Sequence, residues 1–278
     1  INKIEIQKAQ YNCFINNHGG IVDDLIVYRL EEKKYMLVVN AANIEKDWKW
    51  IKKNIQDFDC KIINSSADIG LISVQGPESL NLINDTFSNN FSNLKKFSFN
   101  NITVSNKSII VSNTGYTGSK GYELYIDASI ISSIWNKLID EGKKYKLQPI
   151  GLGARDTLRM EMGYCLYGND IDDETTPYEA NLMWVTDIKK DFIGKEKVLK
   201  SMQISSKKMI NFKMIERGIP RNGYEICDNK GDKIGYVTSG TFSPSNKVGI
   251  GIGYLKIKHS MGDEIFILIR DKLVKAEI

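Results

Sequence analysis

The order of hydrophobic and polar positions predicts where the strands and helices of this chain lie. A run of isoleucine, valine and leucine over residues 19–30 predicts a strand, and residues 35–43 predict a second strand after a tight turn. Apolar side chains then recur at helical spacing over residues 44–55, with Asn43 in place as the N-cap of that helix. We therefore expect a β-hairpin followed by a helix.

The middle of the chain mixes strands and helices. Residues 69–83 predict strand, turn and helix, with Pro77 at the helix start. Residues 108–126 predict two strands around a glycine-rich loop, while residues 131–145 and 151–164 predict helices. An acidic, proline-containing loop follows the last of these helices.

From about residue 207 the pattern changes to short strands separated by Gly, Asn, Asp or Pro turns, and no helix is predicted. Such spacing is typical of a small β-barrel or sandwich. The predicted fold class is therefore α+β, with a C-terminal domain made of strands.

Composition excludes several classes of protein. Of the 278 residues, 42% are hydrophobic and 26% are charged, which predicts a folded chain with a buried core rather than disorder. The net charge of +4 permits an acidic ligand, but it does not indicate the concentrated basic patch of a nucleic-acid-binding protein. We expect no nucleic-acid partner.

Candidate metal ligands and membrane segments are few. The four cysteines are far apart in sequence and there are only two histidines, so the short ligand spacing of a zinc site is missing. Isolated thiols of this kind are typical of reduced core residues in cytosolic proteins. No apolar run reaches membrane-spanning length, and we expect neither a metal nor a membrane partner.

Two adjacent acids interrupt the first predicted strand. Asp23 and Asp24 are flanked by isoleucine, valine and leucine, although aspartate is a poor strand former and a buried carboxylate is costly unless it is paired. Because side chains alternate across a strand, we expect the two acids to face opposite sides.

The stretch TGYTGSKGYELYI, residues 114–126, has a glycine at every third position. Such a loop lets the backbone approach a ligand, Tyr116 can stack on a flat ring, and Glu123 can accept two parallel hydrogen bonds from an amidine-like edge such as that of a pterin. The alternative is a simple glycine-turn hairpin with a surface glutamate. Spacing alone favours this alternative.

Arg155 lies in the first turn of the helix predicted over 151–164, where the helix dipole favours anions. A residue placed against its local preference indicates a functional demand. Neutralisation of Arg155 and Arg159 by Asp156 and Glu161 on a solvated helix face explains the placement equally well.

Seven motifs occur in order along nearly the whole chain and together resemble the aminomethyltransferase, or T-protein, family of the glycine cleavage system. They are QYNCFINNHGGIVDDLIVYRL, VVNAANIEKDWKW, VQGPES, NTGYTGSKGYEL, GLGARDTLRMEMGYCLYGNDIDDETTPYEANLMW, DFIGKE and GYVTSGTFSPS. The wider superfamily contains folate-dependent demethylases and an iron–sulfur-assembly protein, but the chain is most similar to the T-protein branch.

The resemblance implies a fold of three domains around a central channel that holds tetrahydrofolate. On this plan the domains are residues 1–64, 65–206 and 207–278, and the last is a β-barrel. Family members have a further segment before the first domain and a short tail after the last one. We expect that both are missing from this chain.

The resemblance also implies a reaction. The family takes an aminomethyl group from the dihydrolipoyl arm of a partner, the lipoylated H-protein, releases ammonia and passes the one-carbon unit to tetrahydrofolate. Tetrahydrofolate is then the expected co-substrate, with no metal. The expected location is the bacterial cytoplasm, or the mitochondrial matrix if the source is eukaryotic.

Site residues follow from matching positions. Asp24 is expected to be catalytic beside the reactive amine of the folate, where a carboxylate can orient the amine, take up a proton or stabilise positive charge. Glu123 is expected to accept hydrogen bonds from the pterin edge, with Arg155 in the same pocket. The expected folate-binding residues are Tyr11, Asn40, Asn43, Tyr116, Glu123, Arg155 and Arg221.

Two alternatives stay open at this point. The protein could demethylate another small folate-linked donor, or it could be a folate-binding scaffold without transferase activity. Asp24 argues against the scaffold, because a pure binder has no need of that carboxylate.

Overall fold

The computed structural model describes residues 3–278 and groups them into two compact units that are not consecutive in sequence. Unit 1 contains residues up to 11 and residues 25–151, and unit 2 contains residues 12–24 and 152–278. The division into three domains stays a prediction.

Two N-terminal strands contribute residues to both units. Strand β1 (Lys8–Ile15) and strand β2 (Ile21–Glu31) form a three-stranded sheet with β3 (Lys34–Val38), in the order β1-β2-β3. In unit 1, Tyr28 of β2 packs with Phe99 and Tyr125 in a small aromatic core.

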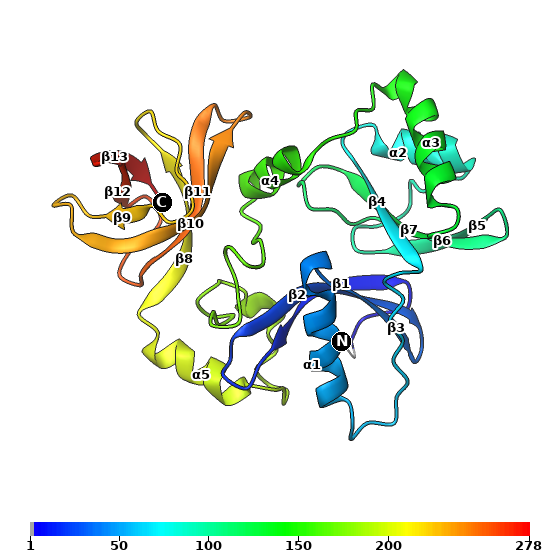
Figure 1. The fold of residues 1–278 in the computed structure, drawn as a ribbon, viewed down its shortest axis with the longest axis horizontal. Helices are drawn as coiled ribbons and strands as arrows, with labels where there is room; N and C mark the ends of the chain where they lie inside the picture. Colours follow the sequence, from blue (N-terminus) through cyan, green and yellow to red (C-terminus); the bar gives the residue numbers. More distant parts are fainter. Residues whose placement is uncertain (1–2) are drawn as a thin grey trace. The chain divides into compact units, whose positions relative to one another are not determined.

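The remaining elements of unit 1 are, in chain order, η1 (Ala41–Asn43), α1 (Ile44–Asn54), β4 (Ile69–Gln75), α2 (Ser79–Phe87), β5 (Phe99–Val104), β6 (Lys107–Ser112), β7 (Gly121–Asp127), α3 (Ile131–Gly142) and η2 (Lys143–Tyr145). The strands among them form a four-stranded antiparallel sheet, ordered β4-β7-β6-β5. Helices α2 and α3 cover one face of this sheet (Figure 1).

Strand β7 has a different environment on each face, and this sets the direction of its polar side chains. Tyr122, Leu124 and Ile126 belong to the core shared with α2 and α3. Since side chains alternate along a strand, Glu123 and Tyr125 point to the opposite face. The carboxylate of Glu123 therefore points away from α2 and α3.

Unit 2 contains α4 (Leu152–Glu161), η3 (Met183–Val185), α5 (Lys195–Ile204), β8 (Lys207–Met214), β9 (Glu225–Cys227), β10 (Lys233–Ser243), β11 (Val248–Lys256), β12 (Glu264–Ile269) and β13 (Lys272–Glu277). Its strands close into a barrel in the order β10-β11-β8-β13-β12-β9 (Figure 1). The barrel interior is filled by aliphatic side chains such as Ile226, Ile265 and Ile267. The predicted α+β class with a C-terminal β-barrel is confirmed.

Local details differ from the sequence prediction at two helix starts. Helix α2 begins at Ser79, two residues after Pro77, with Glu78 at its N-cap position. Asn43 does precede α1, but its side chain makes no capping hydrogen bond, and the residue is also the last of the 3₁₀ helix η1.

The helices of residues 3–278 are short or carry polar side chains. None of the helices in this part of the chain combines the length and apolar character that crossing a bilayer demands.

Candidate functional site

The two adjacent aspartates of β2 lie in different environments. Asp23 is fully buried, with none of its surface exposed, whereas Asp24 is half-buried. This difference follows from the alternation of side chains along the strand. The two acids therefore lie in different environments, and the catalytic role of Asp24 stays a prediction.

The start of β2 is held by the acidic loop within unit 2. The backbone N–H of Ile21 donates to the carbonyl oxygens of Asp172 and Thr175, at 3.1 and 3.0 Å. The side chain of Asn16 donates to the carbonyl oxygen of Asp173 at 2.8 Å. A Cβ on Gly20 would overlap the same carbonyl oxygen, so a larger residue there would separate the hairpin from the loop.

Two thiols lie near Asp24. Burial raises the pKa of Cys13 well above its ordinary value, and the charge of Asp24 raises it further. Burial also raises the pKa of Cys165 to about 12, with smaller contributions from the charges of Asp170 and Asp24. Both thiols near Asp24 are therefore neutral at physiological pH.

Glu123 lies in a buried cluster of hydroxyl groups in unit 1. Its side chain is only 8% exposed, and its Oε2 accepts a hydrogen bond of 2.5 Å from Thr114. The Tyr28 hydroxyl lies 3.1 Å from Thr114 Oγ1, 2.8 Å from the Tyr125 hydroxyl and 3.1 Å from Ser112 Oγ. Burial raises the pKa of Tyr125, and the nearby Tyr28 and Glu123 raise it further. The interpretation of Glu123 as a surface residue is therefore wrong.

The glycine-rich loop is shaped by Gln75 of β4. A Cβ on Gly115 or on Gly121 would overlap the Gln75 side-chain amide. That amide donates to the carbonyl oxygens of Thr114 and Tyr122, at 3.3 and 3.4 Å. These two glycines make room for a glutamine, a reason that glycine spacing in the sequence does not reveal.

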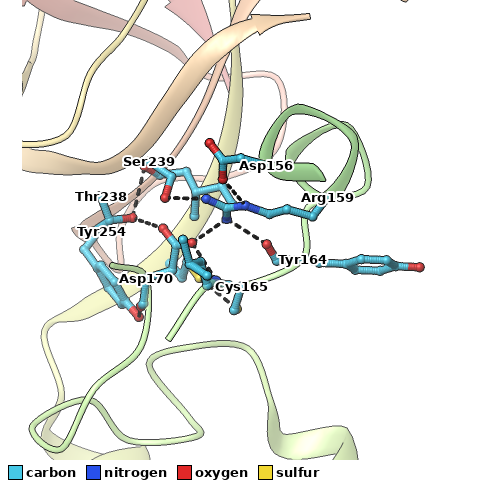
Figure 2. Close-up of polar contacts among 11 residues, drawn as sticks. Asp156, Arg159, Tyr164, Cys165, Asp170, Thr238, Ser239 and Tyr254 are labelled. Atoms are coloured by element: carbon cyan, nitrogen blue, oxygen red, sulfur yellow. Dashed lines mark hydrogen bonds and ion pairs between the residues drawn. The ribbon is translucent and has the colours of Figure 1, made fainter. Parts of the chain in front are cut away.

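Helix α4 carries two arginines with contrasting surroundings. Arg155 in the first turn is exposed, whereas the Arg159 side chain is only 1% exposed. Arg159 Nη1 lies 2.6 Å from Asp170 Oδ2, and its Nε lies 2.8 Å from Asp156 Oδ1 (Figure 2). The solvated helix face that the sequence suggested is therefore wrong for Arg159.

The Arg159–Asp170 ion pair is completed by the barrel. Arg159 Nη2 donates to Ser239 Oγ at 2.9 Å, and Thr238 Oγ1 donates to Asp170 Oδ1 at 2.5 Å (Figure 2). Glu161, at the end of the same helix, accepts hydrogen bonds from Ser243 and Ser245 of the barrel. The hydrogen bond from Ser243 is the main cause that lowers the pKa of Glu161.

The eight predicted site residues divide between the units. Tyr11, Asn40, Asn43, Tyr116 and Glu123 belong to unit 1, and Asp24, Arg155 and Arg221 belong to unit 2. Asn43 and Glu123 are buried, Tyr11, Asp24, Asn40 and Tyr116 are half-buried, and Arg155 and Arg221 are exposed. Arg221 donates to the carbonyl oxygen of Gly240 at 3.2 Å. The roles of all eight stay predictions.

The hydroxyl cluster around Glu123 was missed by sequence reasoning. Tyr28 offered one signal, because it follows Asp24 by four positions on a strand and interrupts an aliphatic run. Ser112 and Thr114 offered another, since they flank the end of β6 at alternate positions. Neither signal indicates that the hydroxyl groups of Tyr28, Ser112 and Thr114 lie together near Glu123.

Potential metal-ligating side chains are scattered through the fold. Across the described part of the chain, no group of three or more His, Cys, Asp or Glu residues is arranged to hold a metal ion.

Comparison with known proteins gives matches along the whole chain. The profile of the GCVT N-terminal domain family matches residues 1–190, and that of the glycine cleavage T-protein C-terminal barrel domain matches residues 207–278. An aminomethyltransferase of Bacteroides fragilis is 47% identical over 280 residues, which span 98% of this chain and 76% of the relative. One from Flavobacterium psychrophilum is 46% identical, over 100% of this chain and 78% of the relative.

A solved structure agrees with these matches. The crystal structure of glycine cleavage system aminomethyltransferase T from Bartonella henselae superimposes with a TM-score of 0.91 at 31% sequence identity. The superposition covers 100% of this chain and 76% of that one.

Proposed function

The chain belongs to the glycine cleavage T-protein family and is an aminomethyltransferase of the glycine cleavage system, and from this premise we propose its substrates and the roles of its residues. The acceptor is tetrahydrofolate, and the donor is the aminomethyl group on the dihydrolipoyl arm of a lipoylated H-protein. Transfer of the one-carbon unit releases ammonia.

The observation that carries this proposal is the position of Glu123. Its carboxylate is 8% exposed and accepts a hydrogen bond from Thr114, so it is held in place rather than moving freely in water. A pterin presents an edge with an amino group and a ring N–H, which matches the two oxygens of one carboxylate. In a site that excludes water, such a pair of hydrogen bonds gives both affinity and orientation.

Asp24 is the second carboxylate that we place beside the folate. Bound tetrahydrofolate provides the amine nitrogen that accepts the one-carbon unit. Asp24 orients that amine through a hydrogen bond and takes up the proton that leaves it, while the negative charge of the carboxylate stabilises positive charge that develops during transfer. Its half-buried position leaves it accessible for this role, whereas the fully buried Asp23 supports the strand.

The two arginines that we expect to bind the folate lie at exposed positions of unit 2. Arg155 and Arg221 contribute positive charge for the acidic parts of the folate, and exposed arginine side chains can form two parallel hydrogen bonds with a carboxylate. The remaining expected contacts are Tyr11, Asn40, Asn43 and Tyr116 of unit 1.

The testing experiment measures methylene-tetrahydrofolate and ammonia formed from aminomethylated H-protein by the full-length protein. We expect equal amounts of the two products, and free methylamine donors should not replace the H-protein. Glu123→Ala should weaken tetrahydrofolate binding roughly tenfold or more, because a hydrogen-bonded acceptor for a ligand is lost. Folate binding without product would indicate the scaffold, and product from a small donor alone would indicate a demethylase-like activity.

A further inference from the structure

We propose that Thr114 and Tyr28 are positioning residues for folate recognition: the hydroxyl of Thr114 fixes the carboxylate of Glu123, and the hydroxyl of Tyr28 fixes that of Thr114. This inference rests on the proposed function, in which Glu123 binds the pterin edge. It adds two residues that need no contact with the folate themselves.

Hydrogen bonds join Glu123, Thr114, Tyr28 and Tyr125 into one cluster. Thr114 Oγ1 lies 2.5 Å from Glu123 Oε2, the Tyr28 hydroxyl lies 3.1 Å from Thr114 Oγ1, and the Tyr125 hydroxyl lies 2.8 Å from that of Tyr28. Tyr28 has no exposed surface and Thr114 is 4% exposed. Four side chains, from β2, β7 and the segment that follows β6, therefore form a connected hydrogen-bonded cluster around Glu123, which Tyr125 also reaches directly.

The charge of the carboxylate sets the direction of the hydrogen bonds in the cluster. An ionised carboxylate only accepts, and a threonine hydroxyl has one proton to donate. When Thr114 donates that proton to Glu123, its oxygen can accept from the Tyr28 hydroxyl, and Tyr28 in turn can accept from Tyr125. Each donation polarises the next hydroxyl, so the chain strengthens the bond that reaches the carboxylate.

Thr114 also restricts the conformation of the Glu123 side chain. The terminal torsion of a glutamate side chain is broad, and a carboxylate that rotates must be ordered when a ligand binds. Threonine is stiff at χ1 because it is β-branched, and the Thr114 backbone is held by a hydrogen bond from Gln75. Thr114 is therefore a rigid donor that sets the plane of the Glu123 carboxylate before folate binds.

The experiment uses calorimetric binding of tetrahydrofolate to the full-length protein, together with steady-state transfer. Thr114→Val keeps the branched shape but removes the hydroxyl. We expect its Kd and KM for tetrahydrofolate to rise roughly tenfold, while kcat at saturating folate stays at the wild-type value. Thr114→Ser keeps the hydroxyl and should bind folate within about twofold of the wild type.

Two further variants separate positioning from general damage to the cluster. Tyr28→Phe removes the group behind Thr114 and should weaken binding roughly two- to tenfold, the range for one lost neutral hydrogen bond. Ser112→Ala removes an equally buried hydroxyl that accepts hydrogen bonds from Tyr28 and Thr114, so it leaves the Thr114 donor in place. It should lower the melting temperature without changing the folate Kd.

The outcomes distinguish this inference from the proposed function. If Glu123→Ala loses affinity but Thr114→Val binds like the wild type, the positioning role is wrong and the proposed function stands. If Glu123→Ala also binds like the wild type, the assignment of Glu123 fails and the inference fails with it. If Thr114→Val does not fold, Tyr28→Phe and Thr114→Ser decide the question. Wild-type affinity of Tyr28→Phe, or loss of affinity in Thr114→Ser, would then overturn it.

Discussion

At the scale of single residues, burial separates neighbours that look alike in the sequence. Asp23 and Asp24 have the same chemistry and adjacent positions, yet one is enclosed and the other is half-buried. Removing the charge of each should therefore affect different properties of the protein.

Asp24→Asn should lower turnover roughly a hundredfold or more, the scale for loss of a positioned acid–base or electrostatic group. The amide keeps the shape and still forms hydrogen bonds, so folding and folate affinity should change little. Single-turnover transfer, measured beside a thermal melt and a folate titration, checks this prediction.

Asp23→Asn is the matched variant. Because Asp23 is fully buried, its replacement should cost stability, roughly 1–3 kcal/mol, and affect transfer less. If Asp23→Asn instead abolishes transfer while Asp24→Asn transfers normally, the two acids have been assigned the wrong way round. Normal transfer by both variants would make the pair structural.

The cysteines should differ in reactivity in the same way. A thiolate is the species that an alkylating reagent attacks. Burial raises the pKa of Cys165 to about 12 and that of Cys13 well above its ordinary value, whereas Cys60 is exposed. Under native conditions at pH 8, iodoacetamide should label Cys60 well before the other two, as peptide mass analysis would show. Equal labelling rates would contradict the buried environment.

At the scale of elements, helices and strands with a strong hydrophobic periodicity were predictable from the sequence, and those with a weak periodicity were not. The apolar run of β2 gave a correct element because core packing agrees with local preference there. Helix α1 was predicted correctly because its apolar side chains recur at helical spacing. Strand β5 was missed, since it contains two consecutive asparagines, which are poor strand formers. Helix α5 was missed because its apolar side chains do not form a clear stripe along one face of the helix.

The glycine-rich loop gives an element-scale prediction. Gly121→Ala should destabilise the protein by about 0.5–1.5 kcal/mol, because the new methyl group moves the end of the Gln75 side chain and weakens the hydrogen bonds that join β4 to the loop. Chemical denaturation checks the value. Adding Gln75→Ala should recover part of the loss, since the overlap is then relieved.

Gly153→Ala is the control for this substitution. Gly153 lies in α4, where a new methyl group would enter open space, and alanine is the better helix former. The stability of this variant should stay equal to the wild type or rise by up to about 1 kcal/mol. An equal loss in both variants would show that the effect of Gly121 does not come from Gln75.

At the scale of the whole molecule, contacts between residues that are far apart in the sequence limit which features can be predicted from the sequence. The family, the fold class and the C-terminal barrel were predictable because they rest on motifs and local patterns. The surroundings of Glu123 and Arg159 were not, since Tyr28 and Thr114 are 86 residues apart and Arg159 and Ser239 are 80 apart. Only folding brings such partners together.

The buried ion pair of unit 2 tests this long-range organisation. Arg159→Met should destabilise the protein by about 3–5 kcal/mol, because it leaves the Asp170 carboxylate buried without its cation. The double variant Arg159→Met/Asp170→Leu should regain a substantial part of that loss. Guanidinium denaturation of both variants measures the coupling, and equal stability of the single and double variants would contradict it.

The discontinuous sequence of unit 2 has a consequence for synthesis on the ribosome. Residues 12–24 emerge early, yet their partners around Asp172 and Thr175 follow only after all of residues 25–151 have been made. At about 5–20 residues per second, the early strand waits on the order of ten seconds. During that interval its apolar side chains lack their partners in unit 2 and are open to chaperones and to other nascent chains, so the strand that carries Asp24 completes its packing only after the acidic loop has been made.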